Sequence, residues 1–180
     1  MRAIVAIILA AASLSFAASA QTTEPSAVGL WLANDENGNP DAWFLIREHD
    51  GVYEGLIVRM YMKPGERADI VCDRCTDDRR NKPWLGLDII RGMKRDGLNY
   101  TDGTILDPRN GDVYRAKMNV EPDGKTLVVR GYLGISLFGQ NRYWTRLPDS
   151  AFNDIDPRFN PNPVAHKPKT PPRPANSTTR

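Results

Sequence analysis

The sequence predicts an all-β protein: a single antiparallel up-and-down β-barrel of about eight strands. Short runs of alternating apolar and polar residues recur between turn sequences, and there is no long helical pattern. Trp31 stands near the start of this region and Arg146 near its end. Because closing a sheet brings its first and last strands together, we expect these two side chains to meet and close one end of the barrel. A two-sheet sandwich is the alternative architecture.

Eight runs have the composition of strands. The third shows the alternation most clearly, because Leu56, Val58 and Met60 are separated by single residues and so share one face of a regular strand. Asp-Gly at 96–97 and the runs 107–111 and 121–124 supply Pro, Gly and Asp for turns. The expected strands are 28–33, 42–48, 52–62, 87–93, 103–106, 113–120, 126–133 and 137–146.

One connection, residues 63–83, is too polar for a buried strand and too long for a simple turn. Its many Asp and Arg residues indicate either a solvated loop or a lid over the barrel mouth. It contains Cys72 and Cys75, for which a local disulfide, a redox pair, a metal site and free thiols are the alternatives. The disulfide is favoured because the chain carries an export signal.

That signal occupies residues 1–20. Met1-Arg2 is a short positive start, residues 3–16 are apolar or small, and Ala18-Ser19-Ala20 supplies the small residues that a signal peptidase accepts. We therefore expect cleavage after Ala20 and a periplasmic or secreted protein without a stable membrane anchor.

Composition separates one domain from a tail. We expect a barrel domain over 27–147 and an extended or disordered tail over 148–180, where eight of the fourteen prolines fall. The net charge of +2 becomes +1 when Arg2 leaves with the signal peptide. Such an even balance of positive and negative charges offers no electrostatic footprint for nucleic acid.

Candidate chemistry is sparse. His49 lies in an expected turn and His166 in the tail, so neither is evidently beside a nucleophile. Asp102 and Asp107 could act as an acid–base pair, but capping of turns and strand ends is the simpler interpretation. The alternating residues of 35–41 imitate a calcium loop, without its glutamate at the twelfth position. We expect no catalytic residue, no metal and no cofactor, so an enzyme is the least supported function.

Several runs resemble an exported bacterial family, domain of unknown function 2147. They are Cys72-Asp-Arg-Cys75 and residues 81–87, 90–97, 103–111 and 129–139. The resemblance implies a lipocalin-like barrel in the bacterial envelope with no established activity, and Gly29-Leu30-Trp31 is similar to the Gly-x-Trp start of lipocalins. Ala116 replaces a cysteine of many relatives, and Gln140-Asn-Arg-Tyr143 replaces a more usual run, so neither position carries a shared role here.

Three functions remain open. The first is binding of a small, largely apolar or lipid-like ligand inside the barrel, with the cysteine loop as a lid. The second is an envelope scaffold that meets a partner through the tail or the Cys72–Cys75 loop, and the third is an enzyme. Because interior and exterior residues alternate, only about half of the pocket candidates can face inward. These candidates are Leu56, Arg59, Met60, Tyr61, Trp84, Met118, Val129, Tyr132 and Tyr143.

Overall fold

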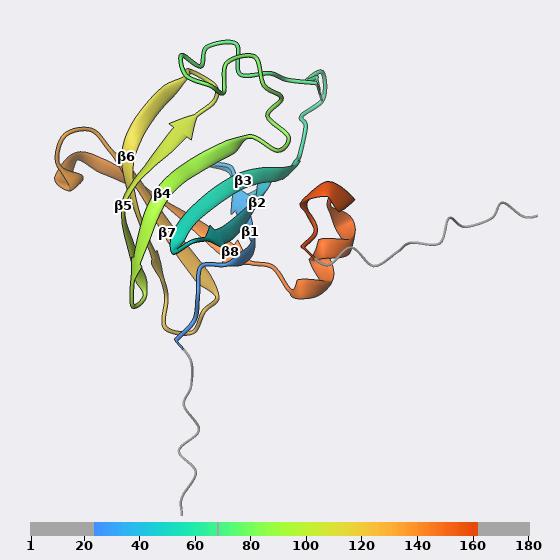
Figure 1. The fold of residues 1–180 in the computed structure, drawn as a ribbon. Helices are drawn as coiled ribbons and strands as arrows, with labels where there is room; N and C mark the ends of the chain where they lie inside the picture. Colours follow the sequence, from blue (N-terminus) through green and yellow to red (C-terminus); the bar gives the residue numbers. More distant parts are fainter. Residues whose placement is uncertain (1–23, 68, 162–180) are drawn as a thin grey trace, which may run out of the picture.

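Eight antiparallel strands form a closed barrel in which each strand pairs with the next and β8 returns to β1 (Figure 1). The structure, a computed structural model, describes residues 24–67 and 69–161. The barrel prediction is confirmed and the sandwich alternative is wrong. The strands are β1 (Gly29–Asn34), β2 (Pro40–His49), β3 (Val52–Met60), β4 (Asp88–Asp96), β5 (Asn99–Asp107), β6 (Asp112–Val120), β7 (Thr126–Tyr132) and β8 (Gly139–Arg146).

The closure of the barrel centres on Trp31 and Arg146, which lie opposite each other in the β1–β8 register. The guanidinium carbon of Arg146 lies 4.1 Å from the centre of the Trp31 ring. Arg146 also donates hydrogen bonds to the backbone oxygens of Ser26, Gly124 and Val28. The expected contact is confirmed, and it ties the segment before β1, the β6–β7 turn and β8 together.

Side chains fill the interior of the barrel. The rings of Phe44 and Trp144 stack with centroids 4.1 Å apart, and Tyr53 meets Tyr100 edge-on at 4.8 Å. The Tyr100 hydroxyl accepts a hydrogen bond from the backbone N–H of Ala27, so its polar end is satisfied. Residues with less than about a tenth of their surface exposed continue this cluster through the barrel: Trp31, Ala33, Ala42, Ile46, Ile57, Leu87, Ile89, Ile90, Met93, Leu106, Ala116, Met118, Val120, Leu127 and Val129.

The connection between β3 and β4, residues 61–67 and 69–87, lies across one end of the barrel (Figure 1). We call it the lid. Cys72 and Cys75 form a disulfide, which confirms the local pairing, and Val71 bridges to Pro83 to make a compact loop. Both cysteines are buried and pack with the interior cluster, as does the partly buried Trp84. Cys72, Cys75 and Trp84 are therefore part of the packed structure, whereas the Asp and Arg residues around them, apart from the buried Arg79, are exposed as a solvated loop requires.

The start of the expected tail differs from the prediction of a disordered segment. Residues 148–161 contain the 3₁₀ helices η2 (Asp149–Asp154) and η3 (Pro157–Phe159). Ala151 and Ile155 pack onto an apolar outer face of the barrel that includes Leu30, Leu45 and Val58. The few apolar side chains of this segment form no core of their own, but they complete one that β1, β2 and β3 expose. The rest of the tail, 162–180, and the expected signal peptide, 1–20, lie outside the described residues.

Two strand limits also differ from expectation. Residues 136–138 form the short 3₁₀ helix η1, so β8 begins at Gly139 and not at 137. β5 begins at Asn99 and spans the turn-like Thr101-Asp-Gly103, where Asp102 adopts a positive φ of 64° and the β5–β6 register shifts. Over the ranges that the structure describes, no helix has the length and apolar character needed to span a bilayer.

Candidate ligand-binding cleft

The structure divides the predicted pocket residues between the two faces of the barrel wall. Met118 and Val129 lie in the interior cluster, and Met60 and Trp84 pack against it. The other five lie on the outside of the barrel, which corrects the prediction that they line a pocket. Leu56 and Tyr61 belong to the outer apolar cluster, and Arg59 lies over the Trp43 ring. Tyr132 and Tyr143 lie on the opposite face of the sheet from the inward Val129 and Trp144.

A β-bulge explains the separation of Leu56 from Met60. Phe44 pairs with Ile57 and Trp43 pairs with Arg59, so Val58 is the extra residue on β3. An extra residue shifts the side-chain alternation by one. Val58 stays on the outer face with Leu56, as regular alternation requires, and the shift after Val58 turns Met60 toward the interior.

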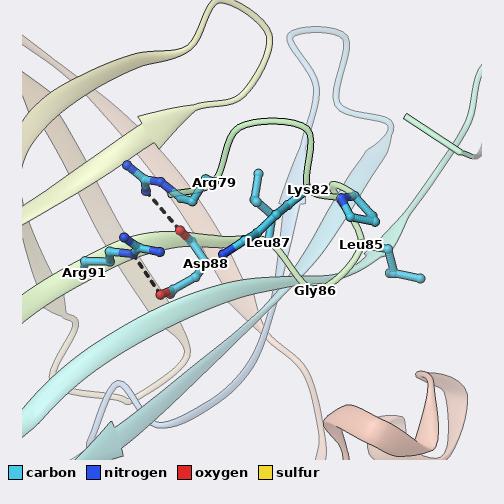
Figure 2. A pocket seen from close by; sticks show the side chains of 8 residues that line it. Arg79, Lys82, Leu85, Gly86, Leu87, Asp88 and Arg91 are labelled. Carbon is cyan, nitrogen blue, oxygen red and sulfur yellow. Dashed lines mark hydrogen bonds and ion pairs between the residues drawn. The ribbon is translucent and has the colours of Figure 1, made fainter. Parts of the chain in front are cut away.

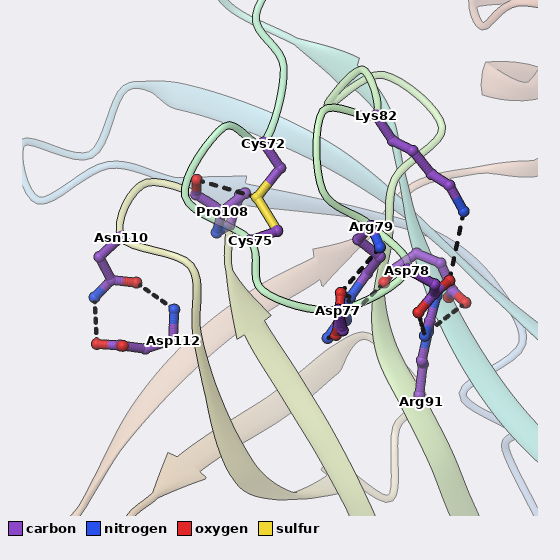
Figure 3. Close-up of polar contacts among 11 residues, drawn as sticks. Cys72, Cys75, Asp77, Asp78, Arg79, Lys82, Arg91, Pro108, Asn110 and Asp112 are labelled. Carbon is purple, nitrogen blue, oxygen red and sulfur yellow. Dashed lines mark hydrogen bonds and ion pairs between the residues drawn. A yellow bond between two sulfur atoms is a disulfide. The ribbon is translucent and has the colours of Figure 1, made fainter.

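Ion pairs and buried hydrogen bonds hold the lid to β4 (Figure 3). Arg79 is 2% exposed and donates a hydrogen bond from Nη1 to the backbone oxygen of Asp88 at 3.0 Å. Its guanidinium also donates to the carboxylate of Asp77. Arg91 on β4 donates two hydrogen bonds to Asp78, at 2.7 and 3.0 Å. We call these contacts the latch. Hydrogen bonding to Arg91 holds the pKa of Asp78 well below its usual range, so the pair is ionised at neutral pH.

The lid also fits closely against the β5–β6 turn. A Cβ at Gly111 would lie 2.1 Å from the backbone oxygen of Arg74, and Gly111 has a φ of +80°. Only glycine meets both conditions without strain. The Cys72 sulfur lies 3.6 Å from the oxygen of Pro108 in the same turn.

A surface cleft of about 310 Å³ opens where the lid meets β4 (Figure 2). Its apolar wall is formed by Pro83, Leu85 and Leu87, with Gly86 between the last two. Its polar wall is formed by Arg79, Lys82, Asp88 and Arg91. Small-molecule sites occupy roughly 300–1,000 Å³. The cleft is therefore large enough for a small ligand only.

Asp88 is the most unusual group in the cleft. Its Oδ2 accepts a hydrogen bond from Arg91 Nε at 2.9 Å, while its Oδ1 is buried and has no partner among the described residues. Burial raises the pKa of Asp88, and the charge of Glu54 adds to this. A buried carboxylate oxygen without a donor costs free energy. Asp88 Oδ1 is closed to solvent, so a ligand's N–H or O–H would reach it only if a neighbouring side chain moved aside.

Lys82 is the cation with the most freedom in the cleft. Its side chain is 57% exposed, and its Nζ lies 3.4 Å from Asp78, whereas the buried Arg79 guanidinium is occupied by Asp77 and the Asp88 backbone. The cleft thus combines an available ammonium, an unsatisfied acceptor and an apolar wall. These features suit a small molecule with both polar and apolar parts.

The other sequence candidates have structural partners. Asp107 is bound by Arg109, which lowers the pKa of Asp107, and Asp102 lies 3.9 Å from Lys94 Nζ. Asp35, in the segment that imitates a calcium loop, accepts backbone hydrogen bonds from Asn37 and Asn39, both at 2.9 Å. Within 24–67 and 69–161, no three His, Cys, Asp or Glu side chains are grouped to hold a metal ion.

Sequence reasoning missed the cleft itself. Asp77, Asp78 and Arg79 have the composition of an exposed loop, and nothing in their order shows that Arg79 is buried. It also missed Phe159, whose ring would lie 2.8 Å from a Cβ at Gly86. The positive φ of Gly86, +87°, is a signal of special geometry, but a glycine in a sequence does not reveal its partner.

The family model described as "Uncharacterized protein conserved in bacteria (DUF2147)" matches residues 29–146, which is more than half of the chain and all eight strands. The chain belongs to the DUF2147 family. Among solved structures, this DUF2147 protein is similar to protein HP1028 of Helicobacter pylori, described as belonging to the lipocalin family. The match has a TM-score of 0.62 at 15% identity and covers 73% of this chain and 91% of that one. It shows a shared lipocalin-like fold. No curated protein matches the chain.

Proposed function

We propose that this DUF2147 protein is an exported, non-enzymatic envelope protein that binds a small ligand in the cleft between the lid and β4. The observation that carries the proposal is the buried, unpartnered Oδ1 of Asp88 beside an apolar wall. Binding proteins place a few directed polar groups in an otherwise apolar concavity, and this cleft has that arrangement.

The cleft is built before a ligand arrives, which supports binding. The disulfide and the Val71–Pro83 bridge fix the shape of the lid, and the latch holds it against β4. Gly86 donates its N–H to the oxygen of Ile57 at 2.7 Å, which fixes the apolar wall against β3. Preorganisation of this kind lowers the entropy cost of association.

The ligand class follows from the groups that line the cleft. A short apolar part would contact Pro83 and Leu85, and an anionic group would meet Lys82. A donor would reach the buried Asp88 Oδ1 once a neighbouring side chain moves aside. This differs from a largely apolar ligand inside the barrel, because interior side chains such as Phe44 and Trp144 occupy that space. A small amphiphile with a donor and an acidic group satisfies all three features.

Export is part of the proposal. Residues 1–20 have the pattern of a cleaved signal peptide, and a disulfide between Cys72 and Cys75 persists in an oxidising compartment. The periplasm of a bacterium meets both conditions.

One observation favours a second candidate, a ligand at the inner side of the lid. The indole Nε1 of Trp84 is buried without a partner among the residues that the structure describes, and Trp84 packs against the interior cluster. A ligand acceptor would satisfy that N–H, and Met60 packs against the same cluster.

Titration with three probes of similar apolar size tests the proposal. Leucine carries a donor and an acid, hexanoate only the acid and hexylamine only the donor. We expect leucine to perturb the amide signals of residues 85–88 most strongly in NMR spectra of the labelled protein. Leu85→Trp should abolish the effect by filling the cleft, while Leu133→Trp, on the exposed β7–β8 connection, should not. Perturbations centred on Met60 and Trp84 would favour the second candidate instead.

A further inference from the structure

The connection between β7 and β8 exposes large aliphatic side chains. It projects from the barrel wall (Figure 1), and Leu133, Ile135 and Leu137 are 65%, 60% and 77% exposed. We call residues 133–137 the apolar tip. A single exposed apolar residue is ordinary, but three within five residues at one projection indicate a contact surface.

The tip has a defined conformation. Arg130 on β7 donates hydrogen bonds from Nε to the backbone oxygen of Ser136 at 2.9 Å and from Nη1 to Asn141 Oδ1 at 2.7 Å. Gly139 brings the chain so close that a Cβ there would lie 2.6 Å from the oxygen of Gly131. The arginine thus holds the aliphatic side chains outward, and the tip needs little ordering when it binds.

Basic side chains lie on the outer face of the barrel, on β7, which leads into the tip, and on the neighbouring β6. Lys117 lies opposite Arg130 in the β6–β7 register, and the guanidinium of Arg115 lies 6.0 Å from the Tyr132 ring. We call Arg115, Lys117 and Arg130 the basic strip. Residues 124–148 contain no Asp or Glu, so the hairpin of β7 and β8 supplies no carboxylate to balance it. Like charges opposite each other on a sheet repel, and an external anion would relieve that repulsion.

We propose that the apolar tip and the basic strip dock this protein onto an anionic lipid surface. Aliphatic side chains enter the boundary of the acyl chains, and Lys and Arg beside them meet anionic headgroups. The exposed Tyr143 and the half-buried Tyr132 are of the type that lies at membrane interfaces. A second copy of the chain is a poorer occupant, because a two-fold contact would bring the basic strips of both copies together.

Co-sedimentation with vesicles tests this docking. The full mature chain is mixed with vesicles of phosphatidylethanolamine and phosphatidylglycerol, and in parallel with phosphatidylcholine vesicles. We expect binding to the anionic vesicles that weakens with added salt. Leu133→Ser/Ile135→Ser/Leu137→Ser should reduce the partition coefficient by about tenfold or more, because the buried aliphatic groups are lost. Val71→Ser, at an exposed valine of the lid, is the matched control and should bind as the unchanged protein does.

A second variant separates the two contributions. Arg115→Gln/Lys117→Gln leaves Arg130 and the conformation of the tip intact, and it should remove most of the salt dependence. Absence of binding to anionic vesicles, or binding that the tip variant retains, overturns the proposal. So does a dimer in light scattering that the tip variant abolishes while no vesicle binding is found. Leu85→Trp leaves the docking surface unchanged, so failure of the ligand cleft and failure of docking are distinguishable.

Discussion

At the scale of single residues, the two polar groups with the largest structural consequence are Arg146 and Asp88. Arg146 closes one end of the barrel, and its guanidinium donates hydrogen bonds to backbone oxygens. Asp88, near the other end, keeps one buried oxygen for which residues 24–67 and 69–161 supply no donor. The first arrangement favours stability, whereas the second has a cost that is most simply explained by a ligand.

Replacing Arg146 tests its structural role. Arg146→Met removes the contact with Trp31 and the backbone hydrogen bonds, and should lower the free energy of unfolding by about 3 kcal/mol. Urea unfolding measures the change. Arg47→Met, which removes an exposed ion pair with Glu54, should cost less than about 0.5 kcal/mol. Equal stabilities of the two variants would show that the contacts of Arg146 do not stabilise the closed barrel.

The latch should respond to pH through Asp78. Because Arg91 lowers the pKa of Asp78 in the folded protein, the ionised pair stabilises the fold above the unfolded pKa, and this is lost as the pH falls. Asp78→Asn should therefore lower the Tm at about pH 6 and lower it less near pH 3, because part of the stabilisation is lost once the pH falls below the unfolded pKa. Thermal unfolding followed by circular dichroism gives both values. A Tm difference that persists unchanged in acid would show that the pair does not act through ionisation.

At the scale of elements, the lid and the segment 148–161 are both held by the barrel wall. The lid is bound by charged groups and by its buried side chains, and the segment by apolar contacts and by Arg59, which donates to the backbone oxygen of Asp154 at 3.2 Å. Phe159 contacts Gly86, so the segment ends beside the cleft. The two elements therefore meet at the proposed ligand site.

Removing the disulfide should loosen the lid alone. A cross-link that closes so short a loop stabilises by about 2 kcal/mol in the chain-entropy account. We expect Cys72→Ala/Cys75→Ala to speed amide hydrogen exchange in residues 70–83 and to leave that of β6 and β7 as it was. Uniformly faster exchange throughout the barrel would contradict a local role.

Truncation tests the packing of the segment 148–161. A chain that ends at Leu147 exposes the apolar face formed by Leu30, Leu45 and Val58, and should lose about 3 kcal/mol and bind the dye anilinonaphthalene sulfonate. A chain that ends at Pro161 keeps the segment and should match the full chain in both measurements. Equal behaviour of the two truncated chains would contradict the described packing.

At the scale of the whole molecule, the barrel could be predicted because its signals are local. Turn residues such as Asp96-Gly97 separate the strands, and Trp31 and Arg146 mark the ends that meet. The cleft could not be predicted, because it depends on how the lid packs on β4 and on a bulge at Val58 that reverses the faces of β3. The order in residues 148–161 could not be predicted either, since it depends on an apolar face outside the barrel.

The central claim is that the ligand lies in the cleft and not in the barrel interior. Native mass spectrometry of the protein isolated from bacteria that produce it tests this most directly. We predict a bound small molecule in the unchanged protein and in Leu133→Trp, and its loss in Leu85→Trp. Retention of the same bound mass by Leu85→Trp, or the absence of any bound molecule, would contradict the claim.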